Sequence, residues 1–162
     1  VRRGRKRVQV DDGGAHLYER VGGKKQSDGA FHRKAWLKCG GYIVIAGTEA
    51  LVAIDVNTGR NKGGRDVEKT ILQTNLEAAD EIARQLRIRD AGGLIVIDFI
   101  DMDSPRHQRD VEEKLKDALK VDRARVQIRR ISRFGLRAMS RQRRPPSLGE
   151  STQTPCTRWA GR

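Results

Sequence analysis

Cysteine and long hydrophobic runs are scarce in this sequence. Its two cysteines, Cys39 and Cys156, lie far apart without framework spacing, so a disulfide scaffold is excluded and a reducing, cytoplasmic compartment is favoured. No apolar stretch approaches the roughly 20 residues that span a bilayer. No apolar segment follows the basic N-terminus, so we expect neither a secretory signal nor a membrane partner.

Positive charge, in contrast, is in excess. Lysine and arginine number 34 against 21 acidic residues, which gives a formal net charge of +13. Such an excess favours a polyanionic partner, most often a nucleic acid. The 162 residues are enough for one domain with a real hydrophobic core.

Two apolar stretches of strand length, residues 50–57 and 94–101, carry a carboxylate near their ends. Both are rich in β-branched residues, which is typical of strands buried on two faces. If the strands end at the same edge, Asp55 and Asp98 place oxygen ligands side by side, as Mg²⁺ or Mn²⁺ requires. Read separately, each Asp serves equally well as a cap for the turn or helix that follows.

The periodicity of apolar residues predicts an α/β fold with a mixed, partly parallel sheet flanked by helices. Residues 41–45 and 49–56 read as two strands joined by a hairpin-like turn. A long amphipathic helix should run from about residue 66 to 89 and lead into a strand at 94–100. A strand, helix and strand in this order indicate a parallel pair joined by a right-handed crossover.

The flanking segments give weaker signals. Residues 11–28 are rich in glycine and charge, and we expect mostly loop there. Pro105 should open a second helix. Residues 126–131 predict a further strand, and 136–139 a last strand at the edge of the sheet. The arginines of 141–144, with two prolines after them, should mark the end of the compact domain.

Several motifs resemble the ribonuclease E/G family. They include Ala53-Ile54-Asp55-Val56-Asn57 and Thr74-Asn75-Leu76-Glu77-Ala78-Ala79, with further segments at 48–51, 92–102, 106–109, 131–136 and 147–151. The resemblance runs from about Trp36 to Cys156. It implies three parts, which are a poorly matching basic segment (1–35), a DNase I-like catalytic domain (36–144) and a tail with a degenerate zinc link (145–162).

The resemblance implies a Mg²⁺-dependent endoribonuclease, with Mn²⁺ as a possible substitute. Such an enzyme cuts single-stranded RNA to 5′-phosphate and 3′-hydroxyl ends, in RNA processing and decay. In the family, the positions that match Asp55 and Asp98 hold the metal, and the position of Asn57 hydrogen-bonds at the scissile phosphate. An acidic residue is usual where Ala46 stands here.

Two alternatives remain. The family's OB-fold and its 5′-end sensing pocket have no counterpart here, which favours a truncated RNA-binding remnant that is catalytically weak or inactive. A phosphoesterase with the same carboxylates acting on another nucleic acid is the other alternative.

Basic side chains near the predicted strand ends are the candidate contacts to RNA. They occur on the polar loop after Asn57 and along the strand near residue 128. The candidates are Arg60, Lys62, Arg65, Arg129, Arg130 and Arg133. Their binding should be electrostatic and sensitive to salt. Aromatic residues make up only 4% of the chain, so we expect Trp36 in a packing role rather than as a base-stacking platform.

The tail predicts that this chain holds no stoichiometric zinc. The family link is a Cys-x-x-Cys motif shared by two subunits, but here Trp159 replaces the second cysteine. Two Cys156 thiolates would fill only half of a tetrahedral site. A homo-oligomer is possible, but not through a complete zinc link. Elemental analysis and solution mass check this expectation, and a zinc-containing dimer that is lost in the Cys156→Ser variant would contradict it.

Overall fold

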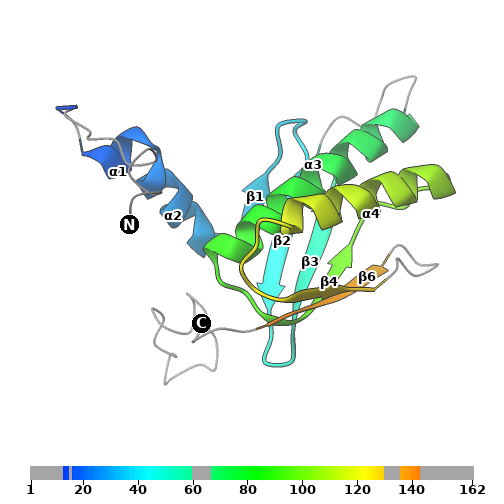
Figure 1. Cartoon of the computed structure of the whole chain (residues 1–162). Helices are drawn as coiled ribbons and strands as arrows, with labels where there is room; N and C mark the ends of the chain where they lie inside the picture. Colours follow the sequence, from blue (N-terminus) through cyan, green and yellow to red (C-terminus); the bar gives the residue numbers. More distant parts are fainter. Residues whose placement is uncertain (1–12, 15, 60–66, 130–135, 143–162) are drawn as a thin grey trace, which may run out of the picture.

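A six-stranded mixed sheet covered on one face by two long helices forms the centre of the fold (Figure 1). The computed structural model describes residues 13–14, 16–59, 67–129 and 136–142. The helices are α1 (Leu17–Arg20), α2 (Gly23–Phe31), α3 (Val67–Ile88) and α4 (Pro105–Leu119). The strands are β1 (Lys34–Trp36), β2 (Tyr42–Gly47), β3 (Leu51–Asn57), β4 (Gly93–Asp98), β5 (Val126–Ile128) and β6 (Leu136–Arg141).

The sheet order is β1-β2-β3-β4-β6-β5, and only β3 and β4 run parallel to each other. Helix α3 connects these two strands, so the predicted strand–helix–strand crossover is confirmed. The α/β class and the mixed, partly parallel sheet are confirmed as well. No helix in the described ranges combines the length and apolar character needed to cross a membrane.

Buried and exposed residues alternate along the strands, so the two faces of the sheet differ. Ile54 and Val56 of β3 are buried, as are Ile95 and Ile97 of β4, and they pack into one core with α3 and α4. Figure 1 shows the two helices lying side by side over the sheet. The alternate strand residues, among them Asp55 and Asp98, are exposed or half-buried on the opposite face. We call this opposite side the open face of the sheet.

The expectation of loop across residues 11–28 was wrong, because α1 and most of α2 lie there. Long-range contacts hold the C-terminal end of α2, whereas α1 has no buried residue. Ala30 is buried, and Arg89, just after α3, donates a hydrogen bond of 2.6 Å to the backbone oxygen of His32. Short helices depend on tertiary contacts more than on propensity, and those contacts are invisible to a local pattern.

The expectation that residues 136–139 form an edge strand was also wrong. Strand β6 lies between β4 and β5, and β5 is the edge. The buried residues of β6 are Arg137, Met139 and Arg141. Arg137 is 1% exposed and forms an ion pair with Glu112 of α4 at 3.3 Å. Two of the three inward positions are arginines, so the hydrophobicity pattern of the sequence does not reveal that this face is buried.

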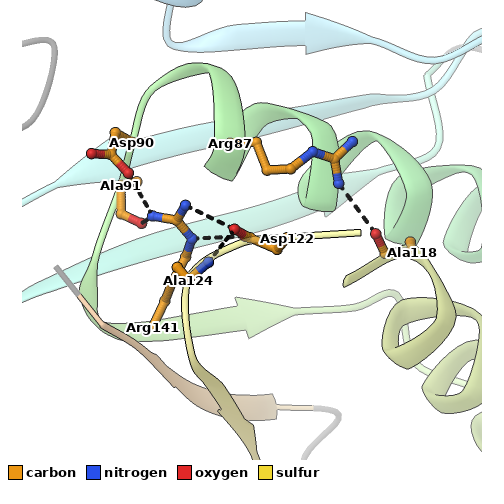
Figure 2. Close-up of polar contacts among 7 residues, drawn as sticks. All are labelled: Arg87, Asp90, Ala91, Ala118, Asp122, Ala124 and Arg141. Carbon is orange, nitrogen blue, oxygen red and sulfur yellow. Dashed lines mark hydrogen bonds and ion pairs between the residues drawn. The ribbon is translucent and has the colours of Figure 1, made fainter. Parts of the chain in front are cut away.

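Arg141, at the end of β6, holds three segments of the chain together (Figure 2). Its Nε donates to Asp122 Oδ2 at 2.9 Å, and its Nη1 donates to Asp90 Oδ1 at 3.0 Å and to the Ala91 oxygen at 2.8 Å. The backbone N–H of Ala124 also donates to Asp122 Oδ1. The side chains of Arg141 and Asp122 are 4% and 3% exposed.

Burial alone would raise the pKa of Asp122, but the hydrogen bonds from Arg141 and Ala124 hold it below the ordinary value. A carboxyl group with a lowered pKa stabilises the fold above its ordinary pKa. This contribution is lost as the pH falls through the lowered value. The contact between Arg141 and Asp122 should therefore support the fold at neutral pH and fail in acid.

We expect Arg141→Leu to lower the free energy of unfolding at neutral pH by about 3–5 kcal/mol, since it leaves Asp122 buried without its cation. Urea denaturation measures the effect. The loss should shrink in acid, where Asp122 becomes protonated. Arg123→Leu, at an exposed arginine of the same turn, is the matched control. Equal losses in the two variants, or a loss independent of pH, would contradict the assigned role of Arg141.

Candidate active site

Asp55 and Asp98 lie side by side on the open face. The parallel register of β3 and β4 pairs these two residues directly, each near the carboxyl end of its strand. Neighbouring strands lie about 4.8 Å apart, and paired residues point to the same side of a sheet. Both carboxylates are exposed. The structure thus brings together the two acidic residues that the sequence singled out.

Asn57 completes this group. It lies two residues beyond Asp55 on the same face, and its Nδ2 donates a hydrogen bond of 2.8 Å to Asp55 Oδ2. The neutral amide orients one carboxylate oxygen without adding charge. Asp55, Asn57 and Asp98 therefore form one cluster. We call Asp55 and Asp98 the carboxylate pair, and Asn57 is the amide beside it.

The electrostatics of the pair suit a divalent cation. Partial burial raises the pKa of Asp98 above its ordinary value, and the negative charges of Asp55 and Asp101 raise it further. A positive ion between the carboxylates would relieve this repulsion. Among the described residues, no group of three or more His, Cys, Asp or Glu could hold a metal. Mg²⁺ commonly takes one or two carboxylates together with water and substrate phosphate, so a two-carboxylate site fits that ion.

Asn75 of α3 fixes the chain just beyond Asp98. Its Nδ2 donates to the Ile100 oxygen at 2.8 Å, and its Oδ1 accepts from the Ile100 N–H at 3.1 Å. Asn75 is fully buried, so this pair of bonds satisfies backbone groups that water does not reach. Sequence reasoning assigned no role to Asn75, although a polar residue inside a helix's apolar stripe is a signal for such an anchor.

Two close backbone approaches fix the chain around Asn57. A Cβ on Gly41 would lie 2.8 Å from the Asn57 oxygen, and one on Gly59 would lie 2.2 Å from the Gly40 oxygen. Gly59 also has a φ of +36°, which disfavours other residues. The turn between β1 and β2 therefore packs directly against the end of β3. The N–H of Cys39 in this turn donates to Glu77 Oε2 of α3 at 2.9 Å, which ties the turn to the helix.

Of the six predicted RNA contacts, Arg129 alone lies in the described part of the chain. Arg129 is exposed just after β5, three strand spacings or roughly 14 Å from β3 across the sheet. Five of the predicted contacts lie outside the described residues, namely Arg60, Lys62, Arg65, Arg130 and Arg133. Cys156 and Trp159 lie outside them too. Ala46 lies on the open face, paired with Ala53 of β3.

The expectation of a packing role for Trp36 was wrong. Its side chain is 66% exposed, at the end of edge strand β1 and beside Tyr42 of β2. The sequence reading also passed over Lys34 and Tyr42. A signal was present, because Lys34 and Trp36 occupy alternate positions before the glycine turn and Tyr42 follows it.

The fold and the site together define an α/β domain with an open pair of carboxylates at the ends of adjacent parallel strands. The chain belongs to the Ribonuclease E/G family, which matches residues 2–144. Ribonuclease E of Haemophilus influenzae is 57% identical over 155 residues, and that of Escherichia coli K12 is 56% identical over the same length. These matches cover 96% of this chain but only 17% and 15% of the two relatives.

Ribonuclease G of Escherichia coli K12 is 44% identical over 133 residues, which cover 82% of this chain and 27% of the relative. The chain therefore spans less than a third of each of these three relatives. The family resemblance noted in the sequence is confirmed, and the family match begins at residue 2 and not near Trp36.

We expect Asp98→Asn to raise the melting temperature of the metal-free protein at neutral pH. Ionising a carboxyl group whose pKa is raised costs stability above that pKa, and the amide removes the cost. The gain should vanish in acid, where Asp98 is already protonated. Mg²⁺ or Mn²⁺ should raise the melting temperature of the unaltered chain, and Asp98→Asn should abolish most of that rise. Thermal denaturation with and without metal measures both effects.

Asp103→Asn is the matched control, since it removes one exposed carboxylate from the loop after β4. This control should keep the stabilisation by metal, whereas Asp55→Asn should lose it. A metal-induced rise that survives in both Asp55→Asn and Asp98→Asn would show that the two residues share no ion.

Proposed function

We propose that this chain is the catalytic domain of a metal-dependent endoribonuclease that cuts single-stranded RNA. The observation that carries the proposal is the direct pairing of Asp55 with Asp98, with Asn57 hydrogen-bonded to Asp55. The products are a 5′-phosphate and a 3′-hydroxyl end, and the work of such an enzyme is the processing and decay of RNA. Membership of the Ribonuclease E/G family supports this reading.

In this proposal, Asp55 and Asp98 hold one Mg²⁺, or Mn²⁺ in its place. When bound, the ion polarises the phosphoryl group, favours ionisation of the attacking water and offsets charge on the leaving oxygen. Asn57 keeps Asp55 in position and presents a neutral amide to the scissile phosphate. The open face leaves both carboxylates accessible to a strand of RNA.

The basic residues named from the sequence supply the electrostatic attraction in this proposal. Arg60, Lys62 and Arg65 follow Asn57 closely along the chain, so they can meet the phosphates on either side of the cut. Three more arginines follow β5 in the sequence and extend the same attraction, namely Arg129, Arg130 and Arg133. The formal charge of +13 supports binding to RNA of any sequence.

We expect the purified chain with Mg²⁺ or Mn²⁺ to cut a 5′-labelled single-stranded RNA, and Asp98→Asn to lower the rate at least a hundredfold, since positioned charge contributes that much or more. Asn57→Ala should lower kcat more than it raises KM. Gel electrophoresis follows the cuts, and sensitivity of the products to a 5′-phosphate-dependent exonuclease identifies their ends.

Asp103→Asn is again the control and should cut at the unaltered rate, because it lies outside the carboxylate pair. RNA binding without cleavage in the unaltered chain would favour the RNA-binding remnant over the enzyme. Cleavage that is unchanged in both Asp55→Asn and Asp98→Asn would place the chemistry elsewhere.

A further inference from the structure

Two aromatic rings and an ammonium group form a second cluster on the open face. The rings of Trp36 and Tyr42 meet edge to face, with centroids 5.4 Å apart and an interplanar angle of 62°. Lys34 Nζ lies 4.1 Å from the Trp36 ring centroid and 3.5 Å from that of Tyr42. We call these three residues the aromatic cluster. An ammonium held by two rings stays oriented at a defined place on the surface.

Burial does not explain the aromatic cluster. Trp36 remains 66% exposed even though Lys34 lies over its ring, so ring surface is left for a ligand. A tryptophan gains little stability when most of it faces water. Aromatic residues are only 4% of the chain, which makes two of them beside each other on this face informative.

The strand register aligns the aromatic cluster with the carboxylate pair. Trp36 is paired with Tyr42, and Tyr42 with Asn57, in one row across β1, β2 and β3. In the neighbouring row Lys34 is paired with Val44, Val44 with Asp55, and Asp55 with Asp98. Figure 1 shows β1, β2 and β3 as successive strands. Trp36 therefore lies two strand spacings, about 10 Å, from Asn57.

A groove extends from the aromatic cluster to Asn57. It has a volume of about 700 Å³, and its walls include Lys34, Trp36, Tyr42, Asn57, Gly40 and Gly59. This volume lies within the roughly 300–1,000 Å³ usual for sites that enclose a small organic group. One end of the groove is aromatic and cationic, and the other reaches the amide that holds Asp55.

We propose that this groove is a base-binding subsite, in which a nucleobase of the bound RNA stacks on the exposed ring of Trp36. Lys34 meets a phosphate of the same strand, and Tyr42 supports both the ring and the ammonium. The assignment rests on the proposed function, because it takes the RNA at the carboxylate pair as its starting point. A nucleotide offers the π-face and the negative charge that this combination of groups recognises.

Stacking of this kind accepts any base, because every base has a π-face. The subsite should therefore position the strand relative to the carboxylate pair without reading its sequence. The carboxylate pair and the aromatic cluster would then bind adjacent parts of one RNA strand. Variants of the aromatic cluster should weaken RNA binding, whereas variants of the carboxylate pair should lower the rate of cleavage.

The test uses Trp36 as its own reporter, because the chain has only two tryptophans, Trp36 and Trp159. In a Trp159→Phe variant with chelator present, a single-stranded RNA oligonucleotide should quench the remaining tryptophan fluorescence. An oligonucleotide with one abasic position, moved along the strand, should lose the quenching at one or two positions. Trp36→Leu should weaken RNA binding about tenfold, and Trp36→Phe should retain most of the affinity.

Further variants separate stacking from charge. Tyr42→Ser should weaken binding as Trp36→Leu does, whereas Lys34→Gln should reduce the slope of affinity against salt by about one contact. Phe31→Leu, at an exposed aromatic residue of α2 outside the groove, is the control and should bind as the unaltered chain does. Equal melting temperatures in these variants confirm that each is folded.

The outcomes distinguish this subsite from the proposed function. If RNA binds and is cut but leaves the fluorescence unchanged, and Trp36→Leu binds normally, the subsite is wrong and the enzyme stands. If RNA quenches Trp36 at defined positions but is never cut, the subsite stands and the proposed function fails. Equal losses of affinity in Trp36→Leu and Phe31→Leu would also overturn the subsite.

Discussion

The in-register pairing of β3 with β4 is the constraint on which the rest of the structure depends. It sets two carboxylates, Asp55 and Asp98, beside each other on one face, where their repulsion opposes folding. The same pairing turns Ile54 and Ile97 inward on the other face, under α3 and α4. Burying such side chains contributes about 1.5–3 kcal/mol each, so the core holds the charged pair in place.

Polar side chains of α3 hold in place the loops that flank the carboxylate pair. Asn75 binds the backbone of Ile100, beyond Asp98, and Glu77 binds the turn that packs against Asn57. Both residues lie near the middle of the helix, where α3 passes the carboxyl ends of the parallel strands. Helix α3 therefore covers the core and also positions both sides of the carboxylate pair.

The spacing of apolar residues in the sequence predicted those elements whose burial follows their own secondary structure. The paired strands, α3 and α4 were predictable because their apolar residues recur at the spacing of their own secondary structure. The place of β6 was not, because Arg137 and Arg141 fill inward positions and their partners Glu112 and Asp122 are distant in sequence. Trp36 was misjudged for a related reason, since cross-strand neighbours such as Tyr42 become known only with the register.

The position of β6 has a consequence for the order in which the chain folds during synthesis. This strand comes late in the sequence yet lies between β4 and β5, so β4 keeps an unpaired edge until residues 136–141 have emerged from the ribosome. Strands β5 and β6 are close in sequence and can form a hairpin before they dock. Unpaired edges invite contacts with other chains, so the nascent sheet is most exposed to aggregation just before β6 arrives.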